Sequence, residues 1–242
     1  MKQHLQSGFS LIEMSIVLII VGALAGSLVT PMRDSIMHAK RRSAQEQLIV
    51  LREAMHGYLI AHGHLPCPVS LSEVNADLAA QKTNNASCAF FHGGFPAVEL
   101  GVLGERSEQG LLLDPWGNPI RYALTGIDHD LLGRTGIADW ADPHELADIG
   151  AGNIAADLEL CRESSIAECP NKHLIASDIV WVVYSTGMHS NPSAAEKENQ
   201  DDDKQFTLRS FSINDEHAFD DHIIWASRSE LIYWLLKANH LP

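Results

Sequence analysis

The stretch SGFSLIEMSIVLIIVGALAGSLVTPM, residues 7–32, decides how this chain is organised. From residue 9 to residue 32 it is apolar apart from small hydroxyl side chains and one carboxylate, Glu13. About 20 helical residues cover a hydrocarbon core of about 30 Å, so the stretch is long enough to cross a membrane. A carboxylate at the centre of a bilayer costs roughly 2.5–3.5 kcal/mol. The sequence therefore predicts a partner for the charge of Glu13.

Two general interpretations of this stretch leave Glu13 without a role. A secretory signal peptide would use Lys2 as its basic end and the ALA triplet at 23–25 as its cleavage site. It would, however, place Glu13 inside the hydrophobic region, and the apolar stretch continues beyond Ala25. A plain single-pass anchor fits the length but gives the carboxylate nothing to do.

A third interpretation gives every residue a role. The segment resembles the prepilin signal of type IV pilins and type II secretion pseudopilins, and it matches that signal in order at Gly8, Phe9, Ser10, Leu11, Ile12 and Glu13. The resemblance implies that a prepilin peptidase cuts after Gly8 and methylates the new N-terminal residue, Phe9. It also implies that Glu13 pairs with the Phe9 amine of a neighbouring subunit, because pairing offsets the cost of two isolated charges in a low dielectric.

The resemblance divides the chain into four parts. Residues 1–8 are the leader peptide, and residues 9–31 are a transmembrane helix that becomes the filament core. Residues 32–63 are an amphipathic helix that continues into the head, and residues 64–242 are a periplasmic globular head. Pro31 predicts a kink or a local loss of hydrogen bonding between the two helical parts.

The amphipathic helix is also predicted by its own pattern. Apolar residues recur at three-to-four spacing and indicate one buried stripe: Leu48, Leu51, Met55, Tyr58 and Leu59. Gly63 and Pro66 predict its end. The fold class is α+β and pilin-like: a long N-terminal helix, transmembrane in its first half and amphipathic in its second, packed on an antiparallel β-sheet head.

The head carries several strand and turn signals. The segment DPWGNP, at 114–119, is dense in turn formers and resembles a segment of the major pseudopilin of type II secretion. We expect Trp116 to fill the head core while the prolines fix this turn. Strands are predicted at 120–124, 178–187 and 206–213, and a final helix at 229–238 with Ser229 as its N-cap.

Four cysteines fall into two local groups, and none forms a C-x-x-C pair, so zinc-ribbon spacing is absent. In a head outside the cytoplasm they favour two disulfides. Of the three possible pairings, the one with the shortest loops joins Cys67 to Cys88 and Cys161 to Cys169. The alternative is four reduced, buried thiols.

Acidic residues gather near the end of the chain. Asp220 and Asp221, the run at 201–203 and the turn STGMHSN at 185–191 offer oxygen ligands close to one loop. Some pseudopilins bind calcium in such a C-terminal loop, and calcium takes six to eight oxygens. We therefore consider Asp220 and Asp221 as calcium ligands, although the spacing is not that of an EF-hand. The alternative is a solvated acidic loop in which one of the two caps a turn. No other cofactor is expected.

The net charge of −14 argues against nucleic-acid binding, because such a surface repels phosphate. The thirteen histidines are scattered without an H-E-x-x-H motif, and neither G-x-S-x-G nor a P-loop is present. We therefore do not expect an enzyme.

The sequence predicts a minor pilin or pseudopilin, a structural subunit of a type IV pilus or of a type II secretion pseudopilus. Its partners would be prepilin peptidase, other pilin or pseudopilin subunits and an inner-membrane assembly platform. It would begin as a single-pass inner-membrane protein with a periplasmic head and then enter a periplasmic or cell-surface filament. The alternative is a membrane-anchored periplasmic binding module that does not polymerise.

Overall fold

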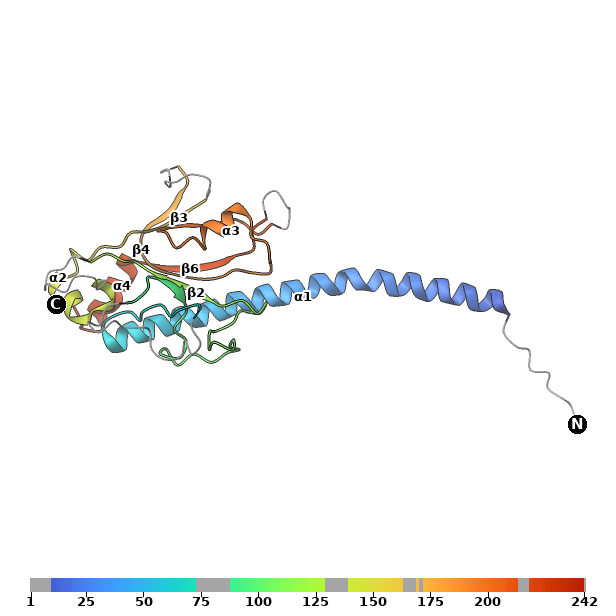
Figure 1. Cartoon of the computed structure of the whole chain (residues 1–242), viewed down its shortest axis with the longest axis horizontal. Helices are drawn as coiled ribbons and strands as arrows, with labels where there is room; N and C mark the ends of the chain where they lie inside the picture. Colours follow the sequence, from blue (N-terminus) through green and yellow to red (C-terminus); the bar gives the residue numbers. More distant parts are fainter. Residues whose placement is uncertain are drawn as a thin grey trace, which may run out of the picture. The chain divides into compact units, whose positions relative to one another are not determined.

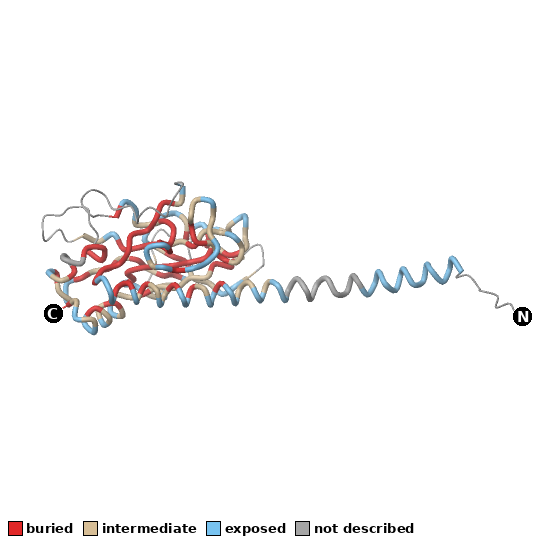
Figure 2. The backbone as a smooth tube through the Cα atoms, turned by 90° about the horizontal axis from the view of Figure 1, so that it is seen from below, coloured by how far each residue is buried: buried red, intermediate tan, exposed pale blue. Residues whose placement is uncertain are grey.

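The structure is a computed structural model that describes residues 10–72, 88–128, 139–162, 169, 172–212 and 218–241. The chain divides into two compact units, residues 1–42 and residues 43–242. Helix α1, Leu11–His62, contributes to both units and continues through Pro31, so it is not divided into two helices there. In the first unit, every side chain from residue 10 to residue 24 is exposed (Figure 2).

The second part of α1 belongs to the larger unit and carries the predicted stripe. Its buried side chains are Ala44, Leu48, Leu51, Met55, Tyr58 and Leu59, which confirms the amphipathic pattern. The helix ends where the sequence predicts, because Gly63 adopts a positive φ of 75° and its N–H donates to the Leu59 carbonyl at 2.8 Å. Glycine is favoured at this position after a helix since it has no Cβ to clash.

The described residues of the larger unit form one six-stranded sheet around a long central strand (Figure 1). Its order is β1-β2-β4-β3-β5, and β6 also pairs with β4. The strands are β1 (His92–Gly94), β2 (Arg121–Leu124), β3 (Leu158–Cys161), β4 (Leu174–Ser185), β5 (Gln205–Thr207) and β6 (His222–Ser227). All pairs are antiparallel except β3 with β5, which is parallel. The α+β class and the largely antiparallel sheet are thus confirmed.

Short helices complete this unit: η1 (Asp139–Ala141), α2 (Pro143–Ile149), α3 (Ala194–Glu198) and α4 (Arg228–Lys237). The predicted final helix is present, but its N-cap is Ser227 rather than Ser229, because the Ser227 side chain accepts from the Glu230 N–H. The predicted strand at 206–213 is much shorter than expected and ends at Thr207.

The second half of β4, from Ile179 to Ser185, is buried on both faces of the sheet. On one face, Trp181 and Val183 join the cluster that contains the α1 stripe and the α4 residues Leu231 and Leu235. On the other, Val182 and Tyr184 pack with residues that include Leu160 and Phe206. The continuous apolar run of this strand follows from its position at the centre of the head.

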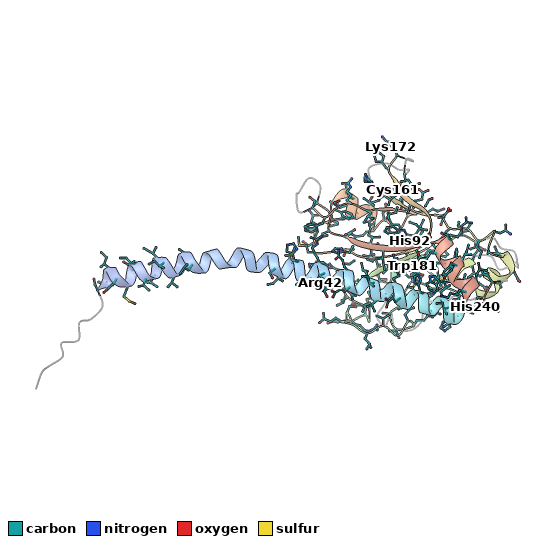
Figure 3. The ribbon with its side chains drawn as sticks, turned by 180° about the vertical axis from the view of Figure 1, so that it is seen from behind. Arg42, His92, Cys161, Lys172, Trp181 and His240 are labelled. Carbon is teal, nitrogen blue, oxygen red and sulfur yellow. A yellow bond between two sulfur atoms is a disulfide. The ribbon has the colours of Figure 1, made fainter. Side chains whose placement is uncertain are left out.

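The described cysteines form two local disulfides. Cys67 is joined to Cys88, with 5.3 Å between their Cα atoms. Cys161, at the end of β3 (Figure 3), is joined to Cys169. This is the pairing that the sequence favours.

Candidate functional site

The N-terminal residues divide between what the structure describes and what it does not. Gly8 and Phe9 lie outside the described residues. Glu13 lies in the first turn of α1, is exposed, and its Oε2 accepts from the Ser10 N–H at 3.3 Å. An acidic side chain is favourable there because the first turn of a helix carries partial positive charge. Within the described part of the chain, no helix combines the length and the apolar character that a membrane crossing requires.

The DPWGNP segment forms a closed turn organised by a buried aspartate. Oδ1 of Asp114 accepts from the N–H groups of Trp116 at 2.9 Å and Asn118 at 2.8 Å, and Gly117 has a positive φ of 90°. The expectation that Trp116 fills the core is wrong. The turn holds the indole at its partly exposed edge, stacked on His222 with 6.0 Å between ring centroids.

This turn is tied to a second turn that follows β4. Oδ2 of Asp114 accepts from the Ser185 hydroxyl at 2.5 Å, and the Asn118 side-chain amide donates to the Gly187 carbonyl at 2.5 Å. The Met188 N–H then donates to Oδ2 of Asp220 at 2.6 Å. The DPWGNP turn, the end of β4 and the start of β6 therefore form one hydrogen-bonded network.

At Gly187 the backbone lies very close to the Asp220 side chain. Its φ is +67°, and a Cβ built there would lie 2.3 Å from Oδ1 of Asp220. Any side chain at this position would push Asp220 away from the end of β4. The absence of a side chain therefore allows a carboxylate to approach the backbone closely.

Three side chains with metal-ligating atoms meet beside Gly187. His189, Glu196 and Asp220 each present one ligand atom, and these atoms lie within 4.8 Å of one another. Nδ1 of His189 is 2.8 Å from Oε1 of Glu196 and 3.3 Å from Oδ1 of Asp220. Glu196 is fixed by a capping box at the start of α3, in which its Oε2 accepts from the Ser193 N–H at 2.7 Å.

The pKa values of the two carboxyl groups in this cluster are shifted in opposite directions. Burial raises the pKa of the Asp220 carboxyl to about 6, although the Met188 N–H and His189 oppose the rise. Burial would also raise the pKa of Glu196, but hydrogen bonds from His189 and from the backbone of Ser193 outweigh it, so the pKa is lowered. Of the two adjacent acids, Glu196 is thus the better stabilised anion.

Asp221 faces a different set of partners. Its Oδ2 accepts from the Asn199 side-chain amide at 2.7 Å, and burial raises the pKa of its carboxyl well above the ordinary value. Asn199 also bonds both backbone groups of Thr207, at 2.7 and 3.1 Å. The structure therefore brings Asp220, but not Asp221, into the three-residue cluster. Calcium at Asp220 and Asp221 stays a prediction.

The sequence analysis missed two members of the cluster, His189 and Glu196. The signal for Glu196 was present, since a serine three residues before a glutamate is a capping box. No comparable signal marks His189, whose position depends on how β4, α3 and β6 meet. The acidic run at 201–203 lies elsewhere: Asp201 and Asp203 form a separate, largely exposed group with Glu198.

Comparison with known proteins gives two matches. The family model described as the prokaryotic N-terminal methylation motif matches residues 3–29. The type II secretion system core protein G of Aeromonas hydrophila is 27 % identical over 160 residues, which cover 64 % of this chain and 97 % of that relative. No solved structure gives a significant match.

Proposed function

We propose that this chain, whose resemblance to the type IV pilins and type II secretion pseudopilins is confirmed by both matches, is a minor subunit of such a filament. The observation that carries the proposal is the position of the methylation motif, at residues 3–29, directly on a helix whose later part forms the core of an α+β head. The match to a core secretion protein favours a type II secretion pseudopilus over a type IV pilus.

The proposed processing uses the first residues of the motif. Prepilin peptidase cuts between Gly8 and Phe9 and methylates the amine of Phe9. This places a positive charge near Glu13 in the first turn of α1. In a filament the Glu13 carboxylate pairs with the amine of a neighbouring subunit, because neither charge is stable alone in an apolar helical bundle. The pair then favours one axial offset between subunits.

The proposed surroundings of the first part of α1 follow from its exposed apolar side chains. Val17 is 51 % exposed, Leu18 68 %, Ile19 70 % and Ile20 53 %, and because successive residues are about 100° apart around a helix, these four lie on different sides of it. A helix that is apolar all round requires apolar cover all round. We assign that cover to the inner membrane before assembly, with residues 9–31 as the span and the head in the periplasm, and to other subunits and the assembly platform afterwards.

The decisive test is the mass of the mature N-terminus, measured on protein from cells with and without prepilin peptidase. We expect loss of residues 1–8 and gain of one methyl group on Phe9 only where the peptidase is active. Retention of residues 1–8 in those cells, or cleavage after Ala25, would contradict the proposal.

A second test separates a filament subunit from an anchored module that does not polymerise. Glu13→Ala should abolish incorporation into sheared filaments, whereas Glu53→Ala, an exposed acid on the later part of α1, should assemble as the unchanged protein does. Full activity of Glu13→Ala without assembly would favour the anchored module. Neither outcome requires the head to be an enzyme.

A further inference from the structure

The cluster of His189, Glu196 and Asp220 has no role in the proposed filament function. It brings together His189 from the turn after β4, Glu196 from α3, and Asp220, which lies two residues before β6 begins. The Glu196 side chain is 1 % exposed and the Asp220 side chain 2 %, whereas His189 is 20 % exposed. Two carboxylates are therefore withdrawn from water beside one imidazole nitrogen, while the imidazole side chain as a whole stays partly exposed.

Counting protons shows that the three groups cannot satisfy one another when both carboxyl groups are ionised. Nδ1 of His189 carries one proton at most, and the nearer acceptor is Oε1 of Glu196, at 2.8 Å. Oε1 also accepts from the Asp220 N–H at 2.9 Å. Oδ1 of Asp220 then accepts no hydrogen bond from the described part of the chain, although it lies 3.3 Å from Nδ1. Leaving a buried acceptor unmatched is unfavourable.

We propose that His189 Nδ1, Glu196 Oε1 and Asp220 Oδ1 bind one divalent transition metal ion of the zinc class. Zinc bonds of 2.0–2.2 Å in a tetrahedral site place ligand atoms about 3.3 Å apart, which is the separation of Nδ1 and Oδ1. Nδ1 and Oε1 are 2.8 Å apart, the distance of a hydrogen bond, so this pair would have to separate by about 0.5 Å when the ion replaces the proton between them. The two carboxylates neutralise the ion. A water molecule would be the fourth ligand of the ion.

The remaining carboxylate oxygens hold the ligands in place. Oε2 of Glu196 accepts from the Ser193 N–H, and Oδ2 of Asp220 accepts from the Met188 N–H, at 2.7 and 2.6 Å. Such hydrogen bonds behind the ligands fix carboxylate orientation and support metal affinity. One oxygen of each carboxylate is therefore held by the backbone, and the other is presented to the ion, although Oε1 of Glu196 also accepts from the Asp220 N–H.

The donor set favours zinc over calcium. Calcium takes six to eight hard oxygens, whereas an imidazole nitrogen suits zinc, copper, nickel and iron. Asp221 is directed to Asn199 instead, so the cluster does not supply the oxygens that calcium needs. The metal would fasten the loop between β4 and α3 to the start of β6, independently of the filament function proposed above.

The test uses the full-length protein in detergent, stripped with EDTA and titrated with Zn²⁺ alone or Ca²⁺ alone by calorimetry. We expect one Zn²⁺ per chain, without displacement by excess Ca²⁺. His189→Ala should weaken Zn²⁺ binding at least about tenfold. The matched control, His38→Ala, changes an exposed histidine of the first unit and should bind as the unchanged protein does. Glu196 is not substituted because it also caps α3.

A spectroscopic readout keeps the proposal testable if His189→Ala fails to fold. Co²⁺ bound to the unchanged protein should give the visible absorption of a four- or five-coordinate site with nitrogen and oxygen ligands, and Zn²⁺ should remove it. The proposal is overturned if the protein binds no Zn²⁺, if His189→Ala binds it equally well, if Co²⁺ gives only a six-coordinate spectrum, or if Ca²⁺ displaces Zn²⁺.

Discussion

Helix α1 carries large apolar side chains in residues 11–24 and again in residues 48–59, but only the second set includes a buried stripe. Leu18 is 68 % exposed, whereas Leu51 is fully buried. In the second region the buried apolar residues share one side of the helix and join the core of the head, while Ile49 and Val50 stay exposed. In the first region they surround the helix, so one sheet face could not cover them.

The comparison separates two functions of one helix. The second region contributes to the stability of the head, and its composition is fixed by contacts within the chain. The side chains of the first region are exposed, and under the proposed function its composition is explained by contacts outside the chain, with lipid or with other subunits. Each prediction below either compares matched substitutions in the two regions or concerns substitutions in the head alone.

The largest expected difference comes from the same substitution in both regions. Leu51→Ala should lower the free energy of unfolding of the head by about 2–5 kcal/mol, because it leaves a cavity in a closely packed core. Leu18→Ala should leave that free energy unchanged. Denaturant titration of the full-length protein in detergent, followed by the fluorescence of the buried Trp140 and Trp181, measures both. Equal losses would contradict the division into two regions.

The next effect concerns the disulfides, which belong to the head alone. Cys67 and Cys88 are 21 positions apart, and replacing both with alanine should cost about 3 kcal/mol through the entropy of the unfolded chain. Cys161 and Cys169 are 8 positions apart, so their removal should cost about 0.8 kcal/mol less. Denaturant titrations of the two double variants give the difference. A larger loss for the shorter loop would show that local packing, not loop length, determines it.

The regions also differ in how far the sequence could predict them. The stripe of α1 and the central strand β4 were predicted because periodicity and apolar runs are local signals. The parallel pairing of β3 with β5 was not, since it joins distant segments and leaves no short-range pattern. Trp116 was misplaced for a related reason: its turn was recognised, but the partner that holds its ring at the surface, His222, lies far along the chain.

The candidate site shows the same limit. Asp220 was predicted as a metal ligand together with Asp221, but its partners His189 and Glu196 come from a loop and a short helix whose meeting depends on the tertiary fold. The methylation motif at residues 3–29 was recognised from a contiguous stretch that requires no tertiary contact, whereas processing at Gly8 and Phe9 stays a prediction. Sequence reasoning was thus strongest where function depends on a linear signal and weakest where it depends on assembled side chains.

A smaller effect of opposite sign comes from two glycines of α1. Gly57 and Gly22 both have open space where a Cβ would stand. Gly57→Ala should stabilise the head by about 0.5–1 kcal/mol, because alanine loses less conformational entropy in a helix. Gly22→Ala should leave the unfolding of the head unchanged while it raises helix content in the first region. Destabilisation by Gly57→Ala would indicate a contact on that face of α1.

The smallest effect is a pH dependence that resides in the second region. His56 is a residue of α1 that contacts α4. Its Nε2 is 3.3 Å from Oε1 of Glu230, and its ring is 5.6 Å from that of Trp234. Burial lowers the pKa of His56 below its ordinary value of 6.5. Glu230 and Glu53 oppose this shift, and Arg52 adds to it.

Since the unfolded chain binds a proton at His56 more readily than the folded one, its neutral form contributes stability above pH 6.5 that is lost as the pH falls below this value. We therefore expect the unchanged protein to lose more stability between pH 7 and pH 5 than His56→Gln does. Other titrating groups act on both proteins alike, so the difference between the two denaturation profiles isolates His56. His38→Gln, at an exposed position of the first region, should follow the unchanged protein. A His38→Gln profile that matched His56→Gln instead would mean that the first region is coupled to the folding of the head.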